Sequence, residues 1–152
     1  MLKLTPMTES NLSEVVPLFL DEAQTRYWEE GTPLDETTAT GRLRHYLQLP
    51  SYHWILLWNE VVAGYGHLLR SDYLDAWIVS YLVHPDFQGR GLATIFVAET
   101  KAFARSEGIV SLCASIHPDN HASRRVVEKS GFEKVGEPTT LTHHLYRWTT
   151  GK

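Results

Sequence analysis

The feature that most constrains the fold of this chain is a glycine-rich turn that joins a strand pattern to a helix pattern. Residues 76–83 form an apolar run that Pro85 ends, and the turn at residues 88–91 reads Gln-Gly-Arg-Gly. A helix follows, because apolar side chains then recur at helical spacing at Leu92, Ile95, Phe96 and Phe103. A helix that begins in this way presents unpaired backbone N–H groups and the positive end of its dipole. The segment therefore predicts a binding site for a phosphate or pyrophosphate. The glycines lack a Cβ atom, so the anion can come close to the backbone.

Periodicity and breakers elsewhere in the chain predict a mixture of helices and strands. The expected helices are one capped by Thr8 and kinked at Pro17, one over about residues 35–47 and one over about 120–130 that Gly131 ends. The expected strands are residues 52–58 and 61–69, joined by a tight turn at residues 59–60, then 109–116, 133–136 and 143–149. The pattern predicts an α/β (α+β) fold.

Length and composition limit the classes of protein to which the chain can belong. With 152 residues, 43% of them apolar and 21% charged, we expect a single globular domain over residues 1–152. The sequence shows neither a signal peptide nor an apolar run that spans a membrane, so we expect a cytoplasmic protein. The net charge of −4 argues against nucleic acid as a partner. A single cysteine, Cys113, excludes an intrachain disulfide and fits a buried core position.

Over about residues 76–135, three blocks of residues resemble the signature of the GCN5-related N-acetyltransferase (GNAT) family, both in their residues and in their order along the chain. The central block has Gln or Arg, then two residues, Gly, one residue, and Gly or Ala, and it appears here as Gln88, Gly91 and Ala93. The block before it is Leu-Val-His-Pro at residues 82–85. The third block follows it in two parts, Asn-His-Ala-Ser at residues 120–123 and Glu-Lys-Ser-Gly-Phe at 128–132. A lone glycine motif would be weak, whereas three ordered blocks are specific.

The resemblance implies a mixed, mostly antiparallel sheet flanked by helices, whose fourth and fifth strands splay apart to admit the pantetheine arm of acetyl-CoA. In such a fold the backbone of Leu82 and Val83 would pair with that arm. N–H groups of the glycine turn and the first helical turn would hold the pyrophosphate, which concerns Gln88, Gly89, Arg90, Gly91, Leu92, Ala93 and Thr94. Asn120 would bind the cofactor from the far side, with Ser123 close behind it. For Asn120 a simple helix cap is the alternative.

Acyl transfer to an amine requires a route for the amine proton, stabilisation of an oxyanion and departure of the CoA thiolate. An N–H group of the splayed strand, at Val83, would stabilise the oxyanion by the same resemblance. Many relatives place an acidic tyrosine seven residues after the asparagine, but this chain has Val127 there, and residues 76–83 lack the family's frequent glutamate. Asp75 and Tyr81 are the nearest titratable substitutes, and a structural role for each is the alternative. If water supplies the proton instead, replacing Val127 by tyrosine should change the rate only modestly.

Several other polar residues favour plainer interpretations. His143 and His144 are neighbours on an expected strand, so their side chains point to opposite faces and cannot share a metal ion. His84 and His117 follow strands beside prolines and read as loop residues, and we expect no metal site. A basic cluster next to the glycine turn fits either the CoA phosphates or a solvated helix face; its members are Arg90, Arg124, Arg125 and Lys129.

The acceptor is defined only as a class. The first third of the chain is rich in aromatic and acidic residues. They would suit a cationic amine, or the aromatic side chains would simply fill the core and the carboxylates face water. These residues are Tyr27, Trp28, Tyr46, Tyr52 and Trp54 with Glu22, Glu29, Glu30 and Asp35. We expect a small-molecule amine or a protein amine as acceptor, no membrane partner, and a monomer or homodimer.

Two other functions remain open at this stage. The missing tyrosine and glutamate fit a module that binds acyl-CoA without turnover. A nucleotide-binding domain would need the Gly-Lys-Ser/Thr ending of an ATP loop, which the glycine turn lacks.

Overall fold

The computed structural model describes residues 1–27, 32–136 and 143–151. Its strands are β1 (Leu2–Pro6), β2 (Ser51–Trp58), β3 (Val61–Ser71), β4 (Ala76–Val83), β5 (Ser111–Ile116), β6 (Glu133–Val135) and β7 (His144–Thr149). The α-helices are α1 (Glu22–Thr25), α2 (Glu36–Leu47), α3 (Leu92–Ser106) and α4 (His121–Lys129). Short 3-10 helices are η1 (Leu12–Glu14), η2 (Val16–Phe19) and η3 (Pro85–Phe87).

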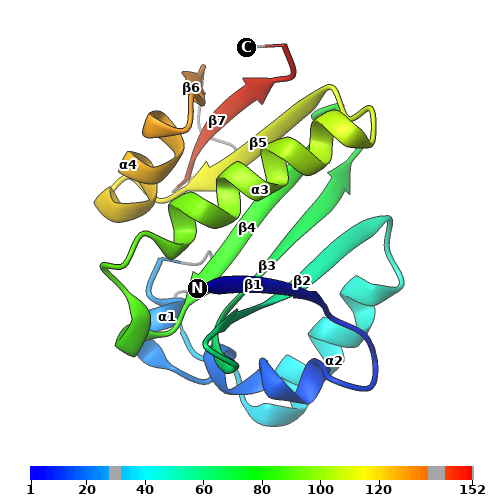
Figure 1. The fold of residues 1–152 in the computed structure, drawn as a ribbon, viewed down its shortest axis with the longest axis vertical. Coiled ribbons are helices and arrows are strands. Elements are labelled where there is room, and N and C mark those ends of the chain that lie inside the picture. Colours follow the sequence, from blue (N-terminus) through cyan, green and yellow to red (C-terminus); the bar gives the residue numbers. More distant parts are fainter. Residues whose placement is uncertain (28–31, 137–142, 152) are drawn as a thin grey trace.

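The strands form one seven-stranded sheet in the order β1-β2-β3-β4-β5-β7-β6. All neighbouring pairs are antiparallel except β4 and β5, which run parallel. A parallel pair needs a crossover connection, and α3 provides it by lying across the sheet between the two strands (Figure 1). The mixed α/β fold with a mostly antiparallel sheet is confirmed.

Two apolar cores lie on the two faces of the sheet. The first gathers side chains of α3, α4 and the central strands around Phe96, Leu112 and Trp148, each 1% exposed or less. The second lies under α2 and the 3-10 helices and includes Leu43, Ile55 and Leu82. Successive side chains of β4 point to opposite faces of the sheet. Val79 therefore belongs to the first core and Leu82 to the second.

The local signals account for most element boundaries. The carboxylate of Asp35 accepts the Thr38 N–H at 2.7 Å and caps α2, and Gly131 ends the α4 region with a φ of 88°. The β2–β3 turn places Asn59 and Glu60 at φ values of 49° and 68°, the left-handed pair that a two-residue hairpin turn requires.

The expected first helix is wrong in type. Residues 12–14 and 16–19 form two 3-10 helices instead of one kinked α-helix, and Thr8 does not cap them, since its N–H donates to Asn11 Oδ1 at 2.7 Å. Pro17 lacks the N–H that a continuous α-helix would use, and it begins the second short helix near its start. The apolar spacing was nevertheless informative, because Leu12, Val15 and Phe19 are buried.

Candidate active site at the parting of β4 and β5

The parallel strands β4 and β5 are paired over only part of their length. Their ladder consists of Trp77 with Leu112 and Ile78 with Cys113. Beyond Ile78 the two strands diverge toward their carboxyl ends, as their arrows show in Figure 1. The outer edge of β4 stays paired with β3 through Val83, and that of β5 stays paired with β7 through Ile116. Within the described residues, no ladder joins residues 79–83 of β4 to residues 114–116 of β5. An extended ligand could insert between these two strand edges.

The alternation of the β3–β4 ladder decides which backbone groups face this opening. The His84 N–H donates to the Ala63 carbonyl at 2.7 Å, and the register between the strands is continuous. In an antiparallel ladder the residues that bond to a given neighbour alternate, so the backbone groups of Leu82 point to β3 and those of Tyr81 and Val83 point toward β5. The geometry therefore favours Tyr81 and Val83, in place of Leu82, as the residues whose backbone meets a ligand between the strands.

The glycine turn lies directly after the open end of β4. Gly89 and Gly91 have φ values of 79° and 77°, and Gly91 is the N-cap of α3. A Cβ atom at either glycine would meet no protein atom within 4 Å, so the space over the turn is empty of protein. Gln88 closes the turn onto the strand, because its Nε2 donates to the Val83 carbonyl at 3.2 Å. The first-turn amides of α3, at Leu92, Ala93 and Thr94, therefore begin beside open space.

Arg90 and the rest of the predicted basic cluster are only partly available to an anion. The Arg90 guanidinium lies 5.5 Å from the centre of the Phe87 ring, and the residue is exposed. Arg124 is engaged within α4 and its entry loop, since its Nη1 donates to the Pro118 carbonyl at 3.0 Å. Arg125 and Lys129 are exposed on α4, which fits both interpretations of the cluster.

Asn120 caps α4. Its Oδ1 accepts the Ser123 N–H at 3.3 Å, which confirms the capping interpretation. A cap uses only the carbonyl oxygen of the side chain. Its Nδ2 amide makes no hydrogen bond within the described residues and remains a donor for a ligand.

Tyr81 carries a buried hydroxyl that has no hydrogen-bond partner within the described residues. The side chain points to the α3 and α4 face, where its ring lies 6.2 Å from that of Phe96. Burial raises the pKa of Tyr81 to about 12, against a smaller opposing effect of the Ser123 hydroxyl. The Ser123 side chain is close enough to lower the pKa of Tyr81 but does not meet the geometry of a hydrogen bond, so the Tyr81 hydroxyl is a donor available to a ligand between β4 and α4.

Val127, at the position of the family's tyrosine, is fully buried in the core around Phe96 and Trp148. A tyrosine side chain would not fit there without displacing its neighbours. Because the substitution would disturb packing, Val127→Tyr does not isolate the effect of an added acid, and the modest change in rate stays a prediction.

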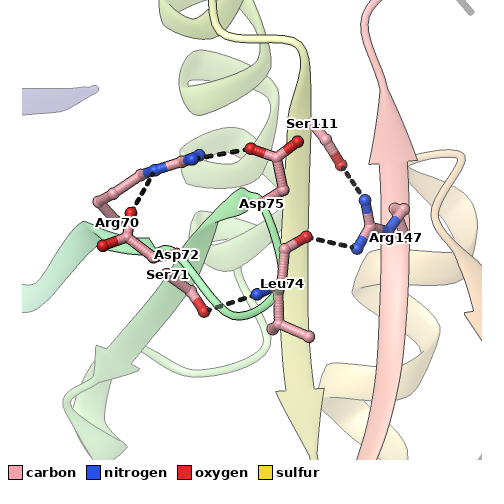
Figure 2. A network of polar contacts seen from close by, with 7 residues as sticks. All are labelled: Arg70, Ser71, Asp72, Leu74, Asp75, Ser111 and Arg147. Atoms are coloured by element: carbon pink, nitrogen blue, oxygen red, sulfur yellow. Dashed lines mark hydrogen bonds and ion pairs between the residues drawn. The ribbon is translucent and has the colours of Figure 1, made fainter.

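Asp75 lies at the opposite end of β4 from the glycine turn, just before the first residue of the strand. Figure 2 shows that it belongs to a polar network at the start of the β4–β5 pair: its Oδ1 accepts a hydrogen bond from Arg70 Nη2 at 2.8 Å. In the same network Arg147 of β7 reaches across β5, donating to Ser111 Oγ at 3.2 Å and to the Leu74 carbonyl at 2.9 Å. We call the set Arg70, Leu74, Asp75, Ser111 and Arg147 the clasp.

The clasp holds the β3–β4 turn onto β5 and β7 where the two parallel strands are still paired. It borders a hollow of about 520 Å³ that is also lined by Trp77 and Glu107. Asp75 is 91% exposed there, on the far side of the paired segment from the opening. The structure thus separates Asp75 from every other predicted site residue.

The predicted histidines take the plainer roles. The Nδ1 atoms of His84 and His117 each accept a backbone N–H two residues further on, at Asp86 and Asp119, both at 3.1 Å. His143 is 4% exposed and its Nε2 bonds to the Tyr27 carbonyl at 2.7 Å. In the described part of the chain no group of three or more His, Cys, Asp or Glu side chains is placed to hold a metal ion.

The aromatic and acidic residues of the first third do not form one surface. Tyr52 and Trp54 pack against Phe103 on the α3 face, with ring distances of 4.6 and 5.3 Å, whereas Tyr46 lies on the other face. Asp35 is used as a cap, and Cys113 is buried with its pKa raised by that burial. Trp28, Glu29 and Glu30 lie outside the described residues.

A buried polar chain on β2 and β3 was not predicted from the sequence. The Tyr65 hydroxyl lies 2.8 Å from His53 Nδ1 and 2.8 Å from His67 Nδ1. Both histidines are 7% exposed and Tyr65 is 2% exposed. The signal in the sequence was the alternation of polar side chains within two apolar strands. Which of these side chains meet depends on a bulge between Leu56 and Leu57, and no sequence pattern marks that bulge.

Comparison with known proteins agrees with this arrangement. The family model "Acetyltransferase (GNAT) domain" matches residues 1–133, and the chain therefore belongs to the GNAT acetyltransferase family.

A mycothiol acetyltransferase of Acidothermus cellulolyticus is 33% identical over 84 residues, which is 53% of this chain and 24% of that protein. The chain thus spans about a quarter of that relative's length. Among solved structures, the ribosomal L7/L12 alpha-N-protein acetyltransferase RimL with coenzyme A is 18% identical, with a TM-score of 0.80 over 97% of this chain and 93% of that one. The aminoglycoside acetyltransferase AAC(6')-Ib with coenzyme A is 19% identical, with a TM-score of 0.81 over 99% and 95%.

The two structural neighbours confirm the fold. No helix in the described ranges has both the length and the apolar character needed to cross a membrane.

Proposed function

We propose that this chain transfers the acetyl group of acetyl-CoA directly to a primary amine within a ternary complex. The observation that carries the proposal is the parting of β4 from β5 immediately before a glycine turn over which no protein atom lies. An extended pantetheine arm would pair with the backbone that faces the opening, at Tyr81 and Val83. Its pyrophosphate would then meet the amides of Gln88, Gly89, Arg90, Gly91, Leu92, Ala93 and Thr94.

The side chains around the opening support distinct roles. The Nδ2 group of Asn120 would donate to the cofactor, and the Val83 N–H, which points toward β5, would stabilise the oxyanion of the tetrahedral adduct. The Tyr81 hydroxyl would donate to the sulfur as negative charge develops there. Its raised pKa keeps it protonated throughout the neutral range, as a donor to an anion must be.

The amine must be neutral to attack, since a free alkyl ammonium, with a pKa of about 10, has no lone pair. Acceptors differ among the relatives, which by name include an acetyltransferase of a ribosomal protein and one of aminoglycosides. For this chain we propose a primary amine of a small molecule or of a protein, and no metal in the chemistry.

The test is a thiol-release assay with acetyl-CoA and a panel of acceptors: a polyamine, an aminoglycoside, an amino acid, a lysine peptide and a peptide with a free amino terminus. Thiol release that depends on one class of amine is the expected result. Tight acetyl-CoA binding by calorimetry without release for any amine would instead favour a module that binds acyl-CoA. Binding of ATP in preference to CoA would overturn both.

A further inference from the structure

The buried chain of Ser51, His53, Tyr65 and His67 has a hydrogen-bond direction that can be worked out from one end. Ser51 Oγ lies 2.8 Å from the carbonyl of Tyr46 and 2.8 Å from that of Leu49. A carbonyl only accepts, so the single hydroxyl hydrogen of Ser51 is donated to one of them. Ser51 Oγ also lies 2.8 Å from His53 Nε2, and toward that atom it acts as acceptor. His53 therefore carries its hydrogen on Nε2, which also points at the Tyr46 carbonyl at 3.3 Å.

The remaining directions follow from this assignment when both imidazoles are neutral. Burial lowers the pKa of His53, and burial with the neighbouring His53 lowers the pKa of His67 to about 3. In neutral His53 the Nδ1 atom has a lone pair, so the Tyr65 hydroxyl donates to it. With its hydrogen used, Tyr65 accepts from His67 Nδ1–H. His67 is left with a lone pair on Nε2, an atom that has no hydrogen-bond partner within the described residues.

The ladder register places His67 beside the part of β4 that has parted from β5. His67 is the direct cross-strand partner of Ser80, so the two side chains share the sheet face that α2 partly covers. Ser80 is exposed, although its neighbours Val79 and Leu82 are buried. Ser80 also lies beyond Ile78, where β4 has already parted from β5. Ser80 is thus accessible on the face that it shares with His67, in the part of β4 that borders the opening.

We propose that His67 Nε2 is the general base that accepts the proton of the attacking amine, and that Tyr65 and His53 carry the positive charge away from it. This inference rests on the proposed transferase function. As the amine nitrogen bonds to the acetyl carbon, its proton passes to His67 Nε2. The Nδ1 proton of His67 passes to Tyr65 Oη, and the Tyr65 proton passes to His53 Nδ1. His53 becomes the imidazolium, and the C–S bond breaks to release CoA.

The relay solves the difficulty that His67 alone is a weak base. A proton that stayed on His67 would leave a charge in its deeply buried site, which its pKa of about 3 opposes. His53 is a better place for the charge, because its Nε2–H is donated to the Tyr46 carbonyl, an interaction that raises the pKa of His53 against the effect of burial. The charge then returns by the same route: His53 Nδ1 passes its proton back to Tyr65, Tyr65 passes its own to His67 Nδ1, and His67 Nε2 releases its proton to the CoA thiolate, which restores the resting tautomers.

The first test needs no activity. Nitrogen-15 spectra of histidine-labelled protein report the tautomer of each imidazole, with assignments from His53→Gln and His67→Gln. We expect His67 protonated on Nδ1 and His53 on Nε2 at neutral pH. A His67 ring protonated on Nε2 would overturn the proposal, because it would leave no lone pair on the atom proposed as the base.

The second test compares His67→Ala and Tyr65→Phe with His45→Ala, a control on the exposed surface of α2. We expect His67→Ala to lower kcat by about 10²–10⁴-fold, the range of general base catalysis, with unchanged acetyl-CoA affinity and partial rescue by added imidazole. Tyr65→Phe should also lower kcat, since it interrupts the relay, but imidazole should not rescue it.

The outcomes separate the relay from the function. Transfer by the wild type with an unaffected kcat in folded His67→Ala would overturn the relay and leave the function intact. A wild type that binds acetyl-CoA but acetylates no amine would overturn both. If His67→Ala simply fails to fold, His67→Gln replaces it, and full activity in that variant would equally overturn the proposal.

Discussion

The two ends of the β4–β5 pair differ in what holds them together, and the difference separates structure from chemistry. At the start of the pair, ladder contacts at Trp77 and Ile78 are reinforced by the clasp, in which Arg147 bonds groups of two other segments. At the other end, within the described residues, no ladder joins the strands, the following turn carries two glycines, and the Tyr81 hydroxyl makes no hydrogen bond. Polar groups that satisfy one another stabilise a fold, whereas polar groups left unsatisfied at an opening are available to a ligand.

The largest effect that this comparison predicts is at Tyr81. We expect Tyr81→Phe to lower kcat by about 10²-fold, at the low end for a proton donor, because a thioester already has a good leaving group. Acetyl-CoA affinity should hardly change. Tyr73→Phe is the matched control, since Tyr73 is 96% exposed on the β3–β4 turn. Equal kcat values for the two variants would remove Tyr81 from the mechanism.

The pH dependence follows from the same side chain. Because burial raises the pKa of Tyr81 to about 12, the hydroxyl stays protonated as the pH rises through neutrality. The kcat/KM of the wild type should therefore rise with pH toward a plateau as the amine loses its proton, without a fall in the mildly alkaline range. A bell-shaped profile centred near neutral pH would indicate an essential acid other than Tyr81.

The next effect is on cofactor affinity at the glycine turn. Gly91→Ala should weaken acetyl-CoA binding about tenfold or more, or roughly 1.4 kcal/mol, because the new Cβ would stand where the pyrophosphate approaches. The control is Gly108→Ala, which introduces similar backbone strain at a φ of 71° and likewise meets no protein atom. Calorimetry should show weaker binding only for Gly91→Ala. Equal losses in both variants would attribute the effect to strain.

A smaller effect is expected on stability when the clasp is cut. Arg147→Met removes two charge-assisted hydrogen bonds, to Ser111 Oγ and the Leu74 carbonyl, from a partly buried side chain. We expect the free energy of unfolding to fall by about 1–3 kcal/mol, with acetyl-CoA affinity unchanged. Urea denaturation measures the first quantity and calorimetry the second. A large loss of affinity at unchanged stability would mean that the clasp shapes the cofactor site directly.

The sequence predicted the open end of the β4–β5 pair better than the buried chain of His53, Tyr65 and His67, because the signals at the open end are local. The turn at Gly89 and Gly91, the cap at Asn120 and the strand over residues 76–83 are each fixed by a few neighbouring residues. The family resemblance then located the parting of the strands.

The relay depends instead on register. In the simple two-residue hairpin, Trp58 pairs with Val61, and continuing that register would set His53 opposite Gly66. The bulge between Leu56 and Leu57 shifts the pairing by one residue and brings His53 opposite His67. No local pattern in residues 52–69 marks that bulge, so the polar chain emerges only from the three-dimensional structure. The 3-10 helices around Pro17 were missed for a related reason, because apolar spacing does not distinguish a 3-10 from an α-helix over so few residues.

The smallest expected effect is at Asp75, which the sequence brought forward as a catalytic candidate and the structure places in the clasp. Asp75→Asn should leave kcat/KM unchanged, because the carboxylate is exposed, pairs with Arg70 and lies on the far side of the paired segment from the opening. Exposed ion pairs contribute little to stability, so the denaturation midpoint should also hardly move. The measurement is kcat/KM against pH with one good acceptor, beside His67→Ala in the same assay. If Asp75→Asn lowered kcat/KM at every pH by the factor expected for His67→Ala while His67→Ala left it unchanged, the base would lie at the clasped end, and the division of the β4–β5 pair into a structural and a chemical end would fail.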